Sequence, residues 1–403
     1  MLSLIPTEAW EYSLKDIISV ASSLFNKKYK DELLDLPGIG KCVPIRSGRV
    51  GILIALKALS LKPDSKIGVP LYCCPVVFKA IKTAGHTPVF IDVENDYCLS
   101  TTDLSHKADG LDALIAVHMF GQACDMKNVL KIMAGKPVIE DAAQSLGSLI
   151  DGKPTGTFGH IGVFSFRSGK YITSGEGGAI FCKNDTISQR LVATIRELPS
   201  PDIKSEIAHL IETYIRTKLR SRPLWGLLGS KIWKIYNRKV SFIDKSPITL
   251  GQIFVSDLKI AKQRIKNLNQ LIEGQRENAR YYLEQLNVPK EMLCLEPSGY
   301  FYNRFMFPIK FNSPEECQYF SDLLVKNNIS SSRPYLDVIE GAHEHYNYQK
   351  DCPTAENLLH TTLVIPVHYN LRKKDIIKIT ETINKALKNL KHNRTKLSDY
   401  KFV

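Results

Sequence analysis

One lysine, Lys170, lies where its amine could do covalent chemistry. It follows an apolar run at 161–166 and precedes several glycines in the stretch FSFRSGKYITSGEGGAIF. Glycines let the backbone approach a bound molecule closely, and a primary amine forms an imine with an aldehyde. The cofactor pyridoxal 5'-phosphate (PLP) requires such an attachment point. A loop lysine considered alone is more often a solvated surface residue. Its polar neighbours must therefore show whether Lys170 is a cofactor-binding residue.

Three further polar residues complete this chemistry. Asp141 ends the apolar run VIED, where a carboxylate without a partner would be costly to bury. Beside the pyridine nitrogen of PLP, a carboxylate keeps that nitrogen protonated and makes the ring an electron sink. Gln144 is close enough in sequence to reach the ring hydroxyl, and Ser165 can offer its hydroxyl to a phosphate oxygen. The alternative for Asp141 is a cap on the following turn.

A phosphate site is indicated where Ser47, Gly48 and Arg49 open the helical pattern RSGRVGILIALKAL. Backbone N–H groups at the start of a helix favour a phosphate, and Arg49 can add a charge-assisted contact. Many helices begin with Ser-Gly, so this triplet supports a phosphate site only in combination with Lys170.

Short apolar runs alternate with helical stretches through the first half of the chain. We expect strands at 66–71, 87–93, 113–120, 137–143, 161–166 and 177–183, and helices at 75–85 and 125–135. This alternation predicts an α/β fold with a largely parallel sheet between helices. Ligands of such sheets bind beyond the carboxyl ends of the strands, so Asp141, Gln144, His118 and Lys170 are expected to face one cleft.

The pattern changes near residue 250. One long helical pattern covers 258–286, followed by a strand, a helix near 313–327, a loop through the 330s to 350s, a strand in TTLVIPV and a basic helix. We therefore expect three parts: an N-terminal helical arm (1–45), a large PLP-binding domain (46–250), and a long linking helix with a smaller C-terminal α/β domain (251–403).

Several segments, read in order, resemble the DegT/StrS family of nucleotide-sugar aminotransferases. They include GVPLYCCPVVFKAIKTAGHTPVFIDV, AVHMFGQACDM, VIEDAAQSLGS, GHIGVFSFRSGKYITSGEGGAIF, SDLKIAKQRIKNLNQLIEGQREN and PTAENLLHTTLVIPVH. The resemblance implies PLP fold type I, in which a mostly parallel seven-stranded sheet lies between helices. It also implies a homodimer with shared active sites, and amino transfer from an amino acid, usually glutamate, to a keto-sugar, usually nucleotide-linked. By motif position, Lys170 holds the cofactor, Asp141 meets the pyridine nitrogen, Gln144 the ring hydroxyl and Ser165 the phosphate.

The chain departs from the family pattern at three places. The family's Ser-Gly-Thr reads Ser47, Gly48 and Arg49, and the aromatic that commonly stacks on the ring is Cys74 here unless Tyr72 substitutes. The family's Asn-x-Arg element, whose Asn reaches the partner subunit's phosphate, begins with Gln252, which can still donate from its amide. Gly48, Arg49, Cys74 and Gln252 are accordingly expected to bind the cofactor.

The smaller domain offers candidates for substrate binding. Arg333 and His368 lie near positions where the resembling family brings loops to the cleft, and they could meet phosphate or sugar hydroxyls. Arg304 lies in the same region. For each, a structural or solvated role is the alternative, as it is for His118, which could be a satisfied strand-end histidine.

Composition limits the other possibilities. The chain carries a formal net charge of +13, of which segments 201–240 and 371–403 hold the whole excess. Neither segment carries a nucleic-acid-binding signature, so no nucleic-acid partner is expected. Nine cysteines without metal-ligand spacing favour a reducing cytoplasm and no metal, and the acidic, non-basic start does not fit a signal peptide.

A segment at 198–248 looks inserted, basic and amphipathic. Its apolar residues at helical spacing are Ile207, Leu210, Ile211, Tyr214, Ile215 and Leu219, and Trp225 and Trp233 follow. Three interpretations stay open: a helical elaboration packed on its own dimer, a lid over the cleft, or a contact of 205–240 with a membrane surface.

The sequence therefore predicts a cytoplasmic, homodimeric PLP aminotransferase, with a peripheral position at the inner membrane surface as the alternative location. Its substrates would be a nucleotide-linked keto-sugar and an amino-acid donor. A PLP-dependent sugar dehydratase is the rival within enzymes. A catalytically weak regulatory or binding relative is the rival from another class.

Overall fold

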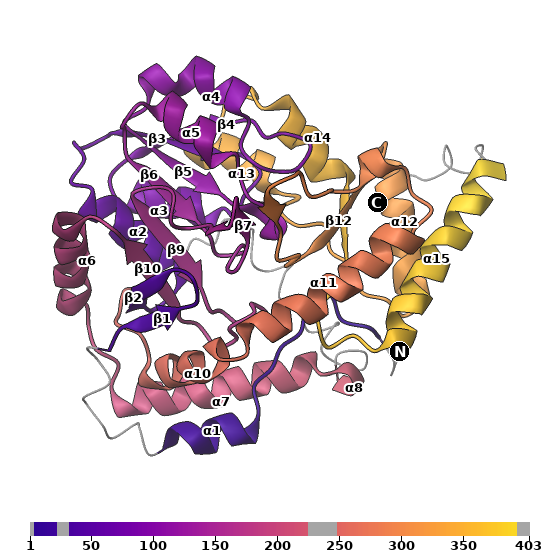
Figure 1. Cartoon of the computed structure of the whole chain (residues 1–403), viewed down its shortest axis with the longest axis horizontal. Helices are drawn as coiled ribbons and strands as arrows, with labels where there is room; N and C mark the ends of the chain where they lie inside the picture. The colour runs from indigo at the N-terminus through magenta and orange to yellow at the C-terminus, as the bar shows by residue number, and fades with distance from the viewer. Residues whose placement is uncertain (1–3, 22–31, 225–247, 393–403) are drawn as a thin grey trace.

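Eight strands form the main sheet of this computed structural model, which describes residues 4–21, 32–224 and 248–392 (Figure 1). In spatial order the strands are β1 (Leu34–Leu36), β2 (Gly40–Ile45), β10 (Gly178–Cys182), β9 (Ile161–Ser165), β6 (Val138–Asp141), β5 (Ala113–Val117), β3 (Lys66–Pro70) and β4 (Thr87–Ile91). Strands β4, β3, β5, β6 and β9 are mutually parallel, whereas β10 and the β1–β2 hairpin pair antiparallel. The expected α/β fold with a mostly parallel sheet is confirmed. Two of the eight strands, β1 and β2, come from 34–45, a range expected in a helical arm, and their hairpin extends the sheet beyond β10.

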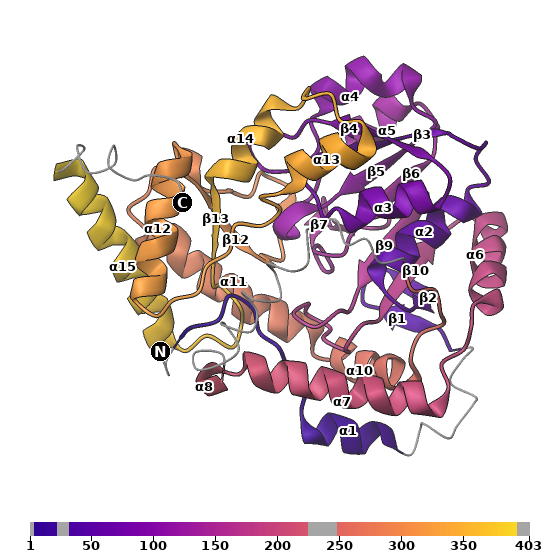
Figure 2. The same cartoon turned by 180° about the vertical axis from the view of Figure 1, so that it is seen from behind.

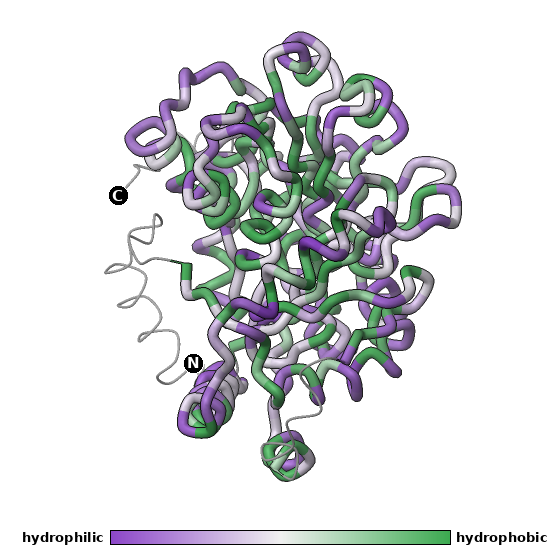
Figure 3. The backbone as a smooth tube through the Cα atoms, turned by 90° about the vertical axis from the view of Figure 1, so that its left-hand side faces the viewer, coloured by the Kyte–Doolittle hydropathy of each residue, from purple (hydrophilic) through white to green (hydrophobic). Residues whose placement is uncertain are grey.

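Helices cover both faces of the sheet, because its strands carry apolar side chains on both sides. Ile115 faces a core built with α2 (Gly48–Ala58), α3 (Val76–Thr83) and α6 (Asp185–Glu197). Its neighbour Leu114 points the other way, into a core with α4 (Thr101–Lys107) and α5 (Met126–Met133). Hydrophobic stretches run through the interior of the molecule, and hydrophilic turns lie at its outer edge (Figure 3).

A second core lies in the C-terminal part. The antiparallel pair β12 (Phe307–Lys310) and β13 (Thr362–Ile365) packs among α11 (Leu268–Gln285), α12 (Pro314–Lys326) and α15 (Lys373–His392). The helix expected over 258–286 is instead two, α10 (Val255–Ile265) and α11. The break falls at Asn267, whose φ of −106° and ψ of 6° leave the helical region.

The expected loop through the 330s to 350s contains two helices, α13 (Val338–Tyr346) and α14 (Pro353–Thr361). Leu358 and Ala342 are buried in the core on the α2 and α3 face of the main sheet. Pro353 opens α14 at a position where its missing N–H costs nothing. These helices are too short for a clear periodic signal, and packing against a distant sheet stabilises them.

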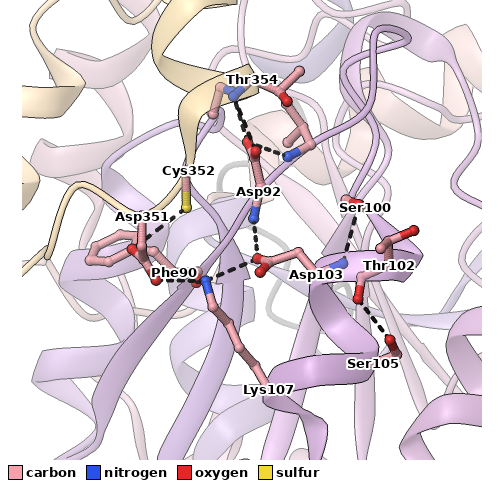
Figure 4. A network of polar contacts seen from close by, with 12 residues as sticks. Phe90, Asp92, Ser100, Thr102, Asp103, Ser105, Lys107, Asp351, Cys352 and Thr354 are labelled. Atoms are coloured by element: carbon pink, nitrogen blue, oxygen red, sulfur yellow. Dashed lines mark hydrogen bonds and ion pairs between the residues drawn. The ribbon is translucent and has the colours of Figure 1, made fainter.

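A polar network fastens α14 to the main sheet (Figure 4). The carboxylate of Asp92, just after β4, accepts the backbone N–H groups of Thr354 (3.0 Å) and Ala355 (2.8 Å). Lys107 bridges Asp103 (2.9 Å) and Asp351 (2.7 Å) beside it. Asp92 therefore caps a helix about 260 residues further along the chain.

The helix α7 (Ile203–Arg220) lies with α10 and α1 (Leu14–Ala21) along the lower edge of the molecule (Figures 1 and 2). The predicted apolar stripe divides: Leu210 is buried against α1 and α10, whereas Ile207, Ile211 and Ile215 are each about half exposed. The buried face of α7 carries Glu206 and other polar residues. Trp225 and Trp233 lie outside the described residues.

The remaining short elements connect these parts. They are β7 (Leu149–Ile150), β8 (Lys153–Pro154), β11 (Tyr300–Phe301), α8 (Arg222–Leu224) and the 3₁₀ turns Ala108–Gly110, Met119–Gly121 and Lys290–Met292. Within the described residues, no helix has both the length and the apolar character needed to cross a membrane.

Candidate active site

Lys170 lies in a loop that joins β9 to β10. The loop folds back on itself, since the N–H of Phe166 donates to Gly177 O (3.0 Å) and that of Ser168 to Gly175 O (3.0 Å). Gly169 has φ of +92°, and a Cβ there would lie 2.7 Å from Glu8 Oε2. Only glycine suits this position, which explains the residue that precedes Lys170.

Buried polar residues support this loop from behind. Asp257 of α10 accepts the N–H of Glu176 (3.1 Å) and pairs with His209 Nε2 of α7 (2.9 Å). Glu206, one turn earlier on α7, accepts the N–H of Val255 (2.6 Å) and so caps α10. The polar buried face of α7 is thus satisfied by hydrogen bonds and helps to hold the loop.

The side chain of Lys170 is partly buried and packs against an aromatic ring. Its Nζ lies 4.2 Å from the centre of the Phe305 ring, a distance typical of a cation–π contact. Burial, followed by the positive charge of Arg167, lowers the pKa of Lys170 to about 8, while Asp141 and Glu8 act in the opposite direction. An amine with a pKa near neutrality can both accept and return a proton.

Asp141 lies at the carboxyl end of β6, paired with Val117 on one side and Val163 on the other. It is 9% exposed, and its Oδ1 accepts the N–H of Ala143 (3.0 Å). Burial raises the pKa of Asp141 above its ordinary value, and Ala143 and Lys170 hold part of that rise back. The structure therefore brings Asp141 within electrostatic reach of Lys170, although 29 residues separate them. The hydrogen bond from Ala143 agrees with the turn-cap alternative.

Gln144 is held on both ends of its amide. Its Oε1 accepts the N–H of Phe120 (3.1 Å), and its Nε2 donates to Tyr335 Oη (3.3 Å). Tyr335 was not predicted from the sequence. Its φ of +65°, which is rare for a non-glycine residue, would have marked it only after the backbone was known.

The start of α2 meets the end of β9. A Cβ built on Gly48 would lie 3.2 Å from the Cβ of Ser165, and the Oγ of Ser165 accepts the N–H of Arg167 (3.5 Å). Ser47 caps α2 by accepting the N–H of Val50 (3.4 Å), and Arg49 lies half-buried in its first turn. Gly48 and Ser165 therefore bring the N–H groups at the start of α2 and a hydroxyl to one region, which suits an anionic group.

Cys74 is also part of this group. Burial raises the pKa of its thiol, and its charged neighbours include Arg167, Asp141 and Lys170. Tyr72, the alternative stacking residue, is fully buried and packs edge-on against Phe120 and Tyr335 at ring-centre distances of 5.9 Å. The thiol therefore has charged residues of the site as neighbours, whereas the Tyr72 ring packs against other aromatic rings.

Other predicted residues are engaged elsewhere. Gln252 donates to Arg196 O (3.1 Å) and accepts from Ser200 (2.7 Å), next to the start of α7. Arg333 donates to Gln318 Oε1 and His360 O, both at 2.8 Å, and so joins α12 to α14. These contacts give Arg333 a structural task within the C-terminal part.

The side chains of His118 and Arg304 serve the scaffold. His118 Nε2 donates to Glu140 (2.9 Å) and Nδ1 accepts the N–H of Cys124 (3.1 Å), which corresponds to a satisfied strand-end histidine. Arg304 donates to Cys294 O (2.6 Å).

His368 does approach the lysine. It lines a small cavity with Lys170, Glu8 and Tyr171, and its Nε2 donates to Pro6 O (3.2 Å). Burial lowers the pKa of His368 to about 4, so the ring is neutral near pH 7. Glu8 was not predicted either, because nothing in its local sequence relates it to a lysine 162 residues away.

The arrangement combines a reactive amine, a carboxylate, an amide and an anion site. A model of the DegT/DnrJ/EryC1/StrS aminotransferase family matches residues 19–204 and 258–384. The unmatched residues between these ranges include most of the predicted insertion.

Relatives and solved structures agree with this match. The chain is 27% identical over 364 residues to UDP-N-acetyl-3-dehydro-alpha-D-glucosamine 3-aminotransferase of Acidithiobacillus ferrooxidans, covering 88% of this chain and 87% of the relative. It is 26% identical over 369 residues to GDP-perosamine synthase of Escherichia coli O157:H7, covering 89% of each. Its fold matches PseC of Helicobacter pylori, an aminotransferase involved in pseudoaminic acid biosynthesis, with a TM-score of 0.74 and 17% identity over 96% of this chain and 100% of that one. It also matches the aminotransferase TlmJ of Streptoalloteichus hindustanus, with a TM-score of 0.73 and 18% identity over the same shares.

Proposed function

Because the chain belongs to the DegT/DnrJ/EryC1/StrS aminotransferase family, it is a PLP-dependent aminotransferase, and we propose that it aminates a nucleotide-linked keto-sugar. An amino acid such as glutamate would supply the amino group. The observation that carries this proposal is the partly buried Lys170 with Asp141 in electrostatic reach and a helix N-terminus beside Ser165 at the start of α2.

The donor set fits PLP group by group. Asp141 would meet the pyridine nitrogen, Gln144 the ring hydroxyl, Lys170 the aldehyde, and Ser165 with the N-terminus of α2 the phosphate. The absence of a side chain at Gly48 keeps the backbone close to Ser165, which leaves their N–H and hydroxyl groups accessible to one ligand. Cys74 and Arg49 would border the same ligand. When bound, PLP supplies an electron sink for the carbon next to the transferred nitrogen.

The chain's own residues would manage the proton. Nζ of Lys170 would accept a proton from the donor's α-carbon and pass it to the cofactor carbon that carries the transferred nitrogen, which its pKa of about 8 permits. The carboxylate of Asp141 would hold a proton on the pyridine nitrogen of the bound cofactor. Phe305 and Tyr171 limit the access of water to the amine.

Nucleotide sugars appear in the names of two relatives, one acting at UDP-N-acetyl-3-dehydro-alpha-D-glucosamine and one forming GDP-perosamine. These names support the acceptor class and a role in building surface polysaccharide or a glycosylated metabolite. His368, beside Lys170, is the better placed of the two substrate candidates, and Arg333 would act through the position of α14.

Incubation with glutamate and a panel of UDP- and GDP-linked keto-sugars tests the proposal. We expect 2-oxoglutarate and an amino sugar in equal amounts, measured by mass spectrometry. Loss of water from the sugar without uptake of nitrogen would identify the dehydratase instead. A protein that binds the sugar but consumes no donor would be the regulatory relative.

We further propose a cytoplasmic homodimer with shared active sites. The side chain of Gln252 contacts Arg196 and Ser200, in the segment that precedes α7. We propose that it reaches the cofactor phosphate of the partner subunit. Sedimentation velocity tests the dimer, and complementation between Lys170→Ala and Gln252→Ala subunits tests the sharing. Restored activity in the mixed dimer supports shared sites.

Contact with a membrane surface is a separate proposal for the range 205–240. Ile207, Ile211 and Ile215 form an exposed apolar row on α7, with Arg216 and Lys218 nearby. We expect sedimentation with anionic vesicles at low salt that a 205–240 deletion abolishes. Vesicles that leave the intact protein in the supernatant would exclude this contact.

A further inference from the structure

The segment at residues 5–12, here called the N-terminal strap, crosses the molecule beside Lys170 on its way to α1. Ile5 pairs with the loop after α12 through hydrogen bonds to Asn328 O (2.9 Å) and Ser330 N (2.8 Å). Pro6 O accepts from His368, and Tyr12 is buried with α1, α7 and α10. Both ends of the strap are therefore anchored in packed structure.

Glu8 projects from the strap onto the lysine loop. Its Oε2 accepts hydrogen bonds from Trp10 Nε1 (3.0 Å) and Arg220 Nη1 (3.3 Å). The same oxygen is so close to Gly169 that a Cβ at that position would clash with it. The carboxylate thus touches the backbone immediately before Lys170.

Cations surround this carboxylate. The Arg220 guanidinium, at the C-terminal end of α7, lies 4.0 Å from the centre of the Trp10 ring and is 17% exposed. Burial disfavours the charged form of Glu8, but Arg220, Arg167 and Lys170 together outweigh it and lower the pKa of Glu8. The region beside the Lys170 amine is therefore an anion site. The carboxylate of Glu8 occupies it.

A small cavity lies beside Glu8, and a buried histidine in its lining has unused hydrogen-bonding capacity. Glu8, Lys170 and His368 line one cavity of about 20 Å³, enough for one water molecule. His368 is 6% exposed, and its Nδ1 has no hydrogen-bond partner in the part of the chain that the structure describes. A buried polar atom of this kind calls for a water or a ligand group.

The proposed transamination supplies the ligand. An amino-acid donor must bring its amine to the position of the Lys170 amine, and its α-carboxylate lies only two bonds from that nitrogen. The donor carboxylate must consequently lie next to the lysine loop. The planar guanidinium of arginine matches a carboxylate with two parallel hydrogen bonds.

We propose that Arg220 binds the carboxylate of the amino donor and that Glu8 occupies Arg220 until the donor displaces it. This inference rests on the proposed function and assigns a specificity role to the end of α7. An anion at Arg220 could equally come from the diphosphate of a nucleotide sugar. The carboxylate is favoured because Glu8 already presents that group beside Gly169, and the two sources are separated below.

Arg220→Met tests the inference, with Arg216→Met as its control. Arg216 lies one turn earlier on α7, is 58% exposed and pairs only at the surface with Glu212. For the PLP-loaded enzyme, Arg220→Met should raise the KM for glutamate at least about tenfold, with a smaller change in kcat, because a charge-assisted hydrogen bond is lost. Arg216→Met should behave as the unmodified protein. Equal melting temperatures and PLP contents establish that both variants fold.

Calorimetric titration with 2-oxoglutarate and with UDP gives a readout that does not depend on turnover. Arg220→Met should weaken 2-oxoglutarate and leave UDP unchanged, and Glu8→Gln should tighten 2-oxoglutarate because the competing carboxylate charge is removed. Equal affinity of Arg220→Met and Arg216→Met for 2-oxoglutarate would overturn the inference, as would selective loss of UDP. Weaker binding of 2-oxoglutarate by Glu8→Gln would show that Glu8 does not compete with the ligand carboxylate for Arg220. Arg220-dependent binding of 2-oxoglutarate without amino transfer from any donor would sustain the site and refute the proposed function.

Discussion

Gly48 and Ser165 touch across the junction of α2 and β9, where a Cβ at position 48 would lie 3.2 Å from that of Ser165. A valine at position 48 would push the helix start away from the serine hydroxyl and separate the two parts of the anion site. We predict that Gly48→Val weakens PLP binding by about tenfold or more, the equivalent of one charge-assisted hydrogen bond. Equilibrium dialysis of PLP against the apoprotein measures this. The control is Gly110→Val, since no heavy atom lies within 4 Å of a Cβ at Gly110.

The pKa of Lys170, lowered to about 8, predicts a pH dependence. Only the unprotonated amine is nucleophilic, so labelling of Lys170 in the apoprotein by formaldehyde and cyanoborohydride should increase with pH through a midpoint near 8. Asp141 raises this pKa by its negative charge, so Asp141→Asn should move the midpoint to lower pH. Peptide mass spectrometry follows the label. A midpoint that is unchanged in the variant would show that Asp141 does not face the amine.

Tyr335 holds Gln144 through a 3.3 Å hydrogen bond. Tyr335→Phe retains the ring and removes the hydroxyl, so Nε2 of Gln144 keeps only its weaker contact with Met119 Sδ (3.3 Å) among the described residues. We expect PLP affinity to fall by a few-fold, in line with about 1 kcal/mol for a neutral hydrogen bond. The same change at Tyr300, a half-buried tyrosine outside this cluster, should leave the affinity unchanged.

Asp92 should stabilise the contact between α14 and the main sheet. Asp92→Ala removes two hydrogen bonds at the start of α14 and should lower the free energy of unfolding by about 1–2 kcal/mol, the usual effect of losing a helix cap. Urea denaturation followed by circular dichroism measures this. Asp109→Ala, on the exposed surface, provides the comparison and should change stability little.

Asp375 predicts a loss of stability in acid. Burial alone would raise its pKa, but hydrogen bonds from Arg372 and Arg222 outweigh it and lower the folded-state pKa below the ordinary 3.8. The ion pairs therefore stabilise the protein fully above that ordinary value and are lost as the pH falls through the lowered one. Asp375→Asn should cost about 2 kcal/mol at pH 7 and progressively less below about pH 4. An equal cost at pH 3 and pH 7 would contradict the ion-pair account.

Local pattern predicted the elements that carry the residues proposed to bind the cofactor. The run before Asp141 is a buried parallel strand, and the glycines around Lys170 form the turn that the spacing suggested. The helix start at Gly48 also followed from one short motif. These features depend on neighbours within a few residues, which a sequence displays directly.

Long-range partners were not predictable in the same way. Glu8 and Arg220 meet across 212 residues, and Asp92 caps a helix beyond any local window. The stripe on α7 was identified as apolar, but Glu206 and His209 occupy the buried side because their partners lie on α10. Which face of an amphipathic helix is buried depends on those partners and not on hydropathy alone.

The central claim, that Lys170 attaches PLP and takes part in amino transfer, is tested most directly by the visible absorption spectrum of the purified protein. The protein should be yellow after incubation with PLP, glutamate should convert the cofactor to its amine form, and Lys170→Ala should lack the yellow band. A protein that remains colourless with PLP, or a Lys170→Ala variant with the same band and the same response to glutamate, would contradict it.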